Sequence, residues 1–355
     1  MDWAMKGNAM DLQVYRHHRQ ERPTNARVPW RAMCAALLVM IAPWCAAAQR
    51  EGAPPQMTVD ALSVVKVNAS MVPDARSAST LGTQREGTGV VIDSNGLVLT
   101  IGYLVMEADE IQLSTADGKV FPATVLGYDN ATGLGLLKSL TPLPIKPVDF
   151  GESASAAERE MVLIVGFDGV APAYIVSKRP FVGYWEYLLD EAIYTAPATV
   201  NWQGAALLDR HGKLLGIGSL VVNDAVGGHA NIPGNVFLPI DLLKPVVGDF
   251  VANGHSTAKP RPWLGINTQE VQGHLIVTRV SPESPADLAG LARGDIIVGI
   301  RGGPVLNQAD FYTKLWGSGD AGVEIVLDVL KGNEITRYPV KSMAREKYLR
   351  PKPVY

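Results

Sequence analysis

The chain has 355 residues, of which 47% are hydrophobic and 19% are charged, and this composition is typical of a globular protein with about two domains. Lys and Arg number 32 against 35 Asp and Glu, and the formal net charge of −3 argues against nucleic acid as the main partner. The 35 glycines and 24 prolines favour short strands and turns over a helical architecture.

The N-terminal 48 residues have the order of an export signal. A basic stretch up to Arg31 precedes an uncharged run, 32–48, which ends in three alanines that suit a signal-peptidase site. We therefore expect residues 1–48 to be a signal peptide and the mature protein to be periplasmic or secreted. The alternative is a retained N-terminal membrane anchor, because the 17 uncharged residues reach the lower limit for spanning a bilayer, although Pro43 disfavours it.

Both cysteines, Cys34 and Cys45, precede the expected cleavage site. The mature chain would then contain no disulfide and no thiolate ligand, and its cores alone would hold it together. No His, Asp and Glu residues have the spacing of a metal site, and we expect neither a metal nor a cofactor.

Residues 57–250 are expected to form a β-rich domain. Asn95-Gly96 separates the apolar runs 89–93 and 97–100, which is a strong hairpin signal. Further short apolar runs with strand character are 111–115, 120–125, 134–137, 161–165, 205–208, 214–217 and 235–238. Their regular spacing predicts an all-β barrel or sandwich. The stretches 182–190 and 240–251 are expected to be helical or irregular.

A polar, proline-containing stretch, 251–261, is the predicted linker to a second domain at 262–343. There, Ser284 is expected to cap a short helix that begins at Pro285, and Asn307 a second helix that ends at Gly317. The predicted strands of this domain are 275–280, 295–300, 323–330 and 336–340. Two helices and several strands in about 80 residues predict a compact α+β module, and the tail 344–355 is expected to be loose.

Three blocks of the first domain resemble a known family. They read GTGVVID with GLVLTIGYLV from Gly87, GYDNATGLGLLK from Gly127, and NWQGAAL with GKLLGI from Asn201. In this order, and followed by the α+β module, they resemble the HtrA/Deg family of exported serine proteases. The resemblance implies a mostly β chain in which a trypsin-like double β-barrel precedes one PDZ domain.

The same blocks lack the residues of a serine protease triad. By the resemblance, Tyr103 stands at the position of the histidine base, Gly133 at that of the aspartate and Gln203 at that of the serine nucleophile. Trp202 and Asn201 replace the neighbouring residues of the oxyanion loop. An amide is no nucleophile, a phenol with a pKa of about 10 is a poor base, and glycine supplies no carboxylate.

We therefore expect a non-catalytic member of the family that acts as a chaperone, adaptor or sensor. The side chains of Tyr103, Trp202 and Gln203 either fill the vacated cleft or line a repurposed pocket in which Trp202 anchors a peptide. The alternative is an active serine endopeptidase of periplasmic protein quality control whose catalytic residues stand at other positions.

The second domain retains a possible peptide site. By the resemblance, Leu264, Gly265 and Ile266 form a loop whose backbone N–H groups bind a peptide carboxylate, and Phe311 and Leu315 form the opposite wall. The alternative is that all of these are core residues. The expected partners are peptides or unfolded segments with apolar C-termini. A homo-oligomer is possible, but a trimer is not indicated, because 49–61 contains no aromatic residue.

Overall fold

The computed structural model describes residues 62–253 and 256–350, which fall within one compact unit, Gln56–Tyr355. The predicted signal peptide, both cysteines and the segment 49–61 lie outside the described residues. No helix within the described ranges is long and apolar enough to cross a bilayer.

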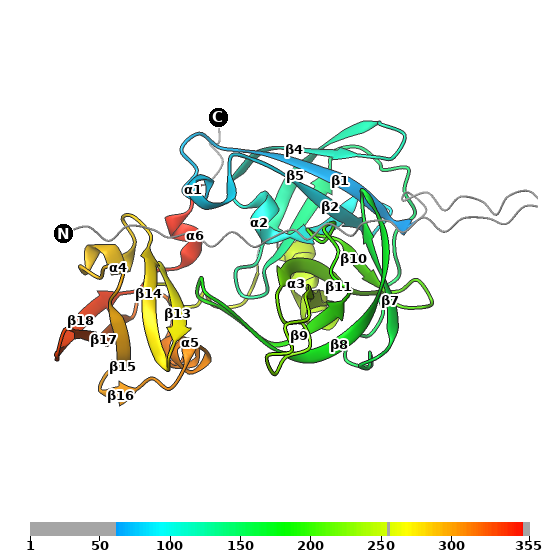
Figure 1. Cartoon of the computed structure of the whole chain (residues 1–355). Coiled ribbons are helices and arrows are strands. Elements are labelled where there is room, and N and C mark those ends of the chain that lie inside the picture. The colour runs from blue at the N-terminus through cyan, green and yellow to red at the C-terminus, as the bar shows by residue number, and fades with distance from the viewer. Residues whose placement is uncertain (1–61, 254–255, 351–355) are drawn as a thin grey trace, which may run out of the picture. The chain divides into compact units, whose positions relative to one another are not determined.

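The first domain begins with a closed six-stranded β-barrel (Figure 1). Its strands, in the order in which they pair around the barrel, are β1 (Val64–Met71), β2 (Gln84–Val91), β3 (Leu97–Ile101), β6 (Leu134–Ser139), β5 (Val120–Tyr128) and β4 (Ala108–Ser114). Two single-turn helices, α1 (Ala78–Leu81) and α2 (Gly102–Val105), follow β1 and β3.

The predicted hairpin around Asn95-Gly96 is confirmed as β2 and β3, in which Val90 pairs with Leu99 and Val91 with Val98. The connection is five residues long, with Gly96 in the left-handed region at φ 85°. The Asp93 carboxylate accepts the Leu97 N–H at 2.7 Å, which holds this loop closed.

A second closed barrel follows, in the pairing order β10 (Ala206–Leu208), β11 (Leu214–Val222), β12 (Gly234–Pro239), β9 (Tyr187–Ala196), β8 (Gly169–Gly183) and β7 (Met161–Gly166). Helix α3 (Ile240–Asn253) confirms the helical alternative for 240–251 and continues three residues into the predicted linker. The helical or irregular prediction for 182–190 is wrong, because most of this stretch belongs to β8 and β9. Their three-residue connection, Tyr184-Trp185-Glu186, contains none of the glycine, proline or asparagine residues that mark a turn.

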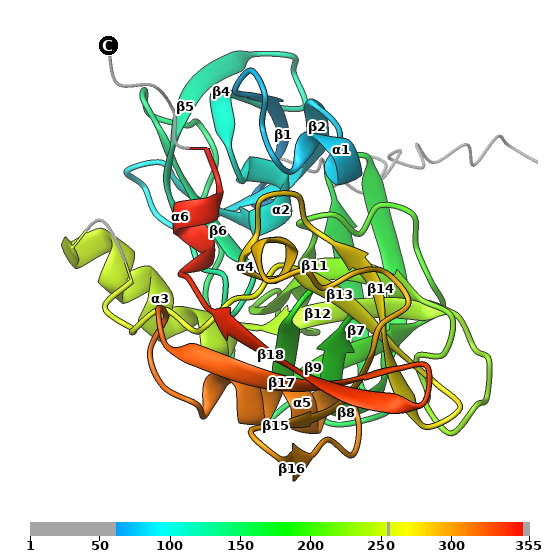
Figure 2. The same cartoon turned by 90° about the vertical axis from the view of Figure 1, so that its left-hand side faces the viewer.

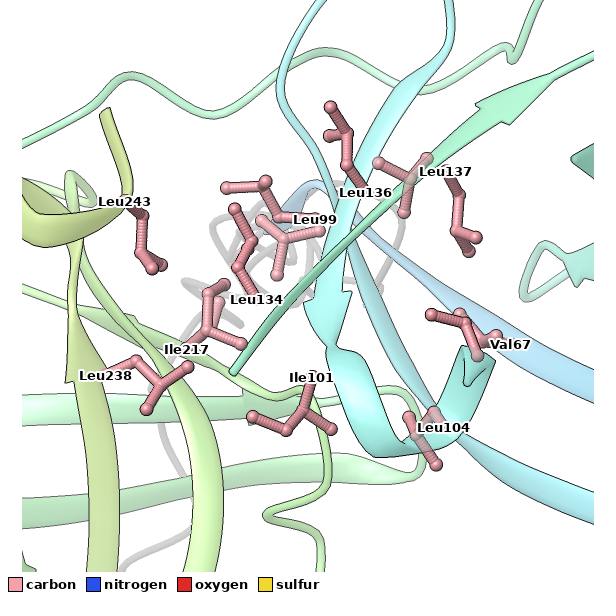
Figure 3. Packing of buried hydrophobic residues seen from close by; sticks show 14 of the residues in the cluster. Val67, Leu99, Ile101, Leu104, Leu134, Leu136, Leu137, Ile217, Leu238 and Leu243 are labelled. Carbon is pink, nitrogen blue, oxygen red and sulfur yellow. The ribbon is translucent and has the colours of Figure 1, made fainter. Parts of the chain in front are cut away.

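The two barrels share one hydrophobic core. Leu99 and Leu134 from the first barrel lie toward Ile217 and Leu238 from the second, and all four are at most 1% exposed (Figure 3). Helix α3 closes this core with side chains such as Leu243. Burial of this apolar surface joins the barrels into one domain.

The C-terminal domain is a six-stranded antiparallel sheet with two helices (Figure 2). Its strands pair in the order β13 (Ile266–Val271), β14 (His274–Val280), β15 (Ile296–Ile300), β17 (Glu324–Lys331) and β18 (Glu334–Lys341), and β16 (Gly303–Pro304) pairs with β15. Both predicted caps are confirmed: the Ser284 side chain caps α4 (Pro285–Leu288), and that of Asn307 caps α5 (Gln308–Trp316).

The prediction of a loose tail is wrong for residues 344–350. Helix α6 (Arg345–Tyr348) follows the sheet, and the Tyr348 ring packs 4.6 Å from Trp263, centroid to centroid. The Tyr348 hydroxyl donates to the Pro282 carbonyl at 2.9 Å, and the guanidinium of Arg76 lies 4.3 Å from the centre of its ring. The contacts of the Tyr348 ring and hydroxyl thus help to fix this segment against both domains.

Candidate functional site

A cavity of about 560 Å³ brings together the three positions at which the resemblance expects a triad. Tyr103 comes from α2, Gly133 from the loop before β6, and Gln203 from the loop between β9 and β10. All three line this cavity. Residues that are 100 positions apart in the sequence thus meet where the two barrels join.

Tyr103 is placed as a neutral hydrogen-bond donor. Its hydroxyl donates to the Ser219 carbonyl at 2.9 Å, and its ring lies at a tilt of 58° against Trp202, with centroids 6.4 Å apart. Burial raises the pKa of Tyr103 well above 10. Because this hydroxyl stays protonated and donates its hydrogen bond to a carbonyl, it is poorly suited to act as a general base.

Gly133 has a backbone that suits glycine and not aspartate. Its φ is +81°, and a Cβ at this position would lie 3.0 Å from the Tyr187 hydroxyl oxygen. The nearby Asp129 carboxylate is engaged in its own loop, where it accepts the Thr132 N–H and hydroxyl at 2.7 Å each. Asp129 therefore holds the loop closed and does not replace a triad aspartate.

The loop that carries Gln203 is held by its backbone. The Gln203 carbonyl accepts the Thr88 N–H at 2.8 Å, and Gly204 lies in the left-handed region at φ 73°. The Asn201 N–H is directed at the Thr199 hydroxyl oxygen, at 3.3 Å. This contact uses the N–H group that the resemblance assigns to binding an oxyanion.

A buried arginine positions α2 and was missed at the level of sequence. Arg85, which is 7% exposed, donates to the Tyr103 carbonyl at 2.6 Å, the Met106 carbonyl at 3.0 Å and the Ser77 hydroxyl at 2.6 Å. Burial lowers the pKa of Arg85 to about 10, against the effect of the Glu107 charge. A charged residue inside strand β2 was the only signal of this network.

Glu107 completes the network around α2. Burial acts to raise its pKa, but hydrogen bonds from Ser77 and from the backbone N–H groups of Arg350 and Arg76 lower it below the ordinary value. The carboxylate therefore stays ionised opposite Arg85. It also ties the C-terminal segment to the first barrel.

The predicted peptide site of the second domain is built from core side chains and backbone donors. Leu264, Ile266, Phe311 and Leu315 are each at most 1% exposed and belong to the domain's hydrophobic core. Gly265 has a φ of +87°, and a Cβ there would lie 2.2 Å from the Ser284 Cβ. Only glycine therefore fits at position 265 of the loop 264–266.

The backbone N–H groups of this loop are occupied by a carboxylate from the first domain. The Glu186 side chain accepts from Leu264 N at 2.9 Å, Gly265 N at 2.7 Å and Ile266 N at 2.9 Å. Burial raises the pKa of Glu186 to about 7, although the three N–H groups and the charge of Arg345 act to lower it. No sequence pattern indicated this residue.

Histidine and acidic side chains elsewhere in the described parts of the chain form no metal site. His211 lies in an exposed turn, where its Nε2 accepts from the side chain of Arg210 at 3.0 Å. Among the residues that the structure describes, no three His, Cys, Asp or Glu side chains could together hold a metal ion.

Comparisons with known proteins match both domains. A trypsin-like peptidase domain model matches residues 87–217, and a PDZ domain model matches residues 262–341. The chain is 26% identical over 279 residues to the putative serine protease HhoA of Synechocystis, covering 70% of this chain and 68% of that protein. It is 30% identical over 275 residues to a probable periplasmic serine endoprotease DegP-like of Ectopseudomonas mendocina, covering 70% of this chain and 55% of the relative.

The chain thus spans about half the length of the DegP-like relatives it matches, 55% for that of E. mendocina and 54% for that of Pseudomonas putida. Among solved structures, the HtrA-type protease AlgW with a decapeptide has a TM-score of 0.47 at 22% identity, over 82% of this chain and 97% of that one. The variant AlgWS227A with a tripeptide has a TM-score of 0.49 at 21% identity, over 82% of this chain and 95% of that one.

Proposed function

We propose that this chain, an HtrA/DegP-type trypsin-like domain followed by one PDZ domain, is an exported protein that binds peptides without cleaving them. The observation that carries the proposal is the set of side chains at the triad positions. Tyr103, Gly133 and Gln203 line one cavity, and none of the three can do the work of a serine, histidine or aspartate.

The side chains of Gln203 and Tyr103 are unsuited to acyl transfer. The nitrogen lone pair of the Gln203 amide is delocalised into its carbonyl, and the Tyr103 hydroxyl is a donor to Ser219 with a raised pKa. Loss of a whole triad lowers turnover on the order of 10⁶-fold, and the remaining rate depends on an oxyanion hole. Here the Asn201 N–H is directed at Thr199, which weakens that remaining contribution too.

Peptide binding is supported by the second domain. PDZ domains bind peptides by strand addition and hold the C-terminal carboxylate on backbone N–H groups. The loop 264–266 carries three such groups, which here bind the Glu186 carboxyl group, and β13 is the edge strand of its sheet. We propose peptides or unfolded segments with apolar C-termini as ligands, and the periplasm as the compartment, since the DegP-like relatives are named as periplasmic.

Labelling with a fluorophosphonate probe, together with casein hydrolysis, tests the absence of catalysis. The purified full chain is expected to show neither, while a DegP-like relative run in parallel shows both. Stoichiometric labelling of this chain would establish the alternative, an active serine endopeptidase. Binding is measured separately, by fluorescence anisotropy with labelled peptides that end in an apolar residue as the free acid or as the amide.

A further inference from the structure

The tip of the β8–β9 hairpin lies in the groove of the PDZ domain, between β13 and α5 (Figure 1). The Thr268 N–H on β13 donates to the Tyr184 carbonyl at 2.9 Å, and the Tyr312 hydroxyl on α5 donates to the Gly183 carbonyl at 2.9 Å. The Glu186 N–H in turn donates to the Tyr312 hydroxyl at 3.1 Å. Both walls of the groove therefore hold the backbone of the hairpin tip.

The direction of these contacts is that of a peptide added to the sheet, with one backbone hydrogen bond, from Thr268 N–H to the Tyr184 carbonyl, between the tip and β13. Glu186 lies opposite Ile266, and Tyr184, two residues earlier, lies opposite Thr268, two residues later on β13. The segment thus runs antiparallel to β13 with its acidic residue at the carboxylate-binding loop. A peptide bound by strand addition places its last residue at that loop in the same direction.

We propose that the β8–β9 tip is an internal ligand of this PDZ groove, in which the Glu186 side-chain carboxyl group takes the place of a peptide's C-terminal carboxylate. A peptide with a free C-terminus must displace the hairpin before it can bind. The groove is therefore suited to a chain that presents a carboxylate after an extended segment, whether that carboxylate ends the chain or belongs to an acidic side chain at a turn. This inference rests on the proposed peptide-binding function.

The local backbone of the tip is consistent with a role beyond closing a turn. A three-residue hairpin loop usually places glycine or asparagine in its left-handed position, and here Glu186 occupies it at φ 55°. The side chain is 7% exposed, and Val182 and Leu188, on the flanking strands, pack against the PDZ core. A strained conformation and a buried carboxyl group are both unfavourable, and the contacts with the groove offset them.

Hydrogen exchange of the full chain tests the internal ligand without any added peptide. In Glu186→Gln an amide N–H₂ replaces one acceptor oxygen opposite the loop, and Glu186→Gly suits the left-handed backbone and removes the carboxylate. We expect the amides of 264–266 and Thr268 to exchange at least roughly tenfold faster in both variants, with amides of β17 unchanged as a reference. Asp190→Asn, which removes an exposed carboxylate from the same hairpin, should exchange as the unsubstituted chain does.

If these amides exchange as slowly in both Glu186 variants as in the unsubstituted chain, the proposal is overturned. Anisotropy with a fluorescein-labelled peptide that ends in valine separates this failure from that of the proposed function. We expect Glu186→Gln to bind the free-acid peptide roughly tenfold more tightly than the unsubstituted chain does, and the amide form no more tightly. Equal affinities would refute the internal ligand and retain peptide binding. Faster exchange without peptide binding in any variant would retain the internal ligand and refute the proposed function.

Discussion

The docking of the β8–β9 tip should depend on pH through Glu186. Burial raises the pKa of this carboxyl to about 7 in the docked state, from an ordinary value of 4.5. Between these two values the docked state binds a proton that the undocked state does not. Docking is therefore favoured most below pH 4.5, and this contribution is lost as the pH rises through 7.

The charged and titratable groups that face Glu186 do not reverse the rise in its pKa. Arg345 acts to lower its pKa, and Tyr312, whose own pKa burial raises to about 12, stays neutral throughout this range. The difference between 4.5 and about 7 corresponds to about 3 kcal/mol of docking free energy. Between pH 5 and pH 8 the ratio of docked to undocked hairpin should then fall roughly 70-fold.

Protection factors of the amides 264–266, which are exchange rates corrected for the intrinsic rate at each pH, measure this ratio directly. The unsubstituted chain should lose protection from pH 5 to pH 8, and Glu186→Gln should show a low and constant protection. Asp190→Asn should follow the unsubstituted chain. Protection that rises with pH would mean that the three N–H groups hold an ionised carboxylate in the groove, and the reasoning from burial would be refuted.

Three further predictions concern stability. Gly204→Ala should lower the free energy of unfolding by at least about 3 kcal/mol, because its φ is +73° and its Cβ would lie 2.1 Å from the Thr88 carbonyl oxygen. Gly118→Ala, at φ +82° in open space, is the matched control and should cost about 1 kcal/mol, and equal melting shifts for the two would contradict the steric argument. Arg85→Leu should lower the free energy of unfolding by about 3–5 kcal/mol, because it leaves the buried Tyr103 and Met106 carbonyls and the Ser77 hydroxyl without their donor, and a melting shift within error would exclude that network as a stabilising element. Tyr348→Ala should increase the rate of limited proteolysis about tenfold at the majority of cleavage sites in the C-terminal segment. An unchanged cleavage pattern would show that other contacts order this segment.

The elements that could be predicted from the sequence are those with a local cause. Ser284 and Asn307 mark helix starts because a short polar side chain satisfies the N–H groups of the first turn. Gly96 marks the β2–β3 connection because its left-handed backbone suits glycine. In each case the interaction partner lies within four residues, and the pattern is visible in a short window.

The elements that could not be predicted depend on partners far along the chain. Glu186 meets the loop 264–266 across about 80 positions, and Tyr348 reaches Pro282 across 66. The β8–β9 connection carries no turn residue, so its conformation is decided by the groove that receives it and not by local preference. For Leu264 and Phe311 the sequence left two readings open, groove walls or core residues, and their side chains are wholly buried.

The two domains differ in the atoms on which their expected activities depend, side-chain atoms for proteolysis in the first and backbone atoms for carboxylate binding in the second. Proteolysis requires particular side chains, and at the triad positions expected from the resemblance this chain carries Tyr103, Gly133 and Gln203 within two closed barrels. Carboxylate binding at 264–266 is performed by backbone N–H groups, which side-chain substitution leaves in place. A buried N–H without an acceptor costs about 1–3 kcal/mol, so the loop must be occupied by some acceptor or be open to water. Under the proposed function, Glu186 and an incoming C-terminus compete for this loop, and the exchange rates of its three amides report which of them holds it.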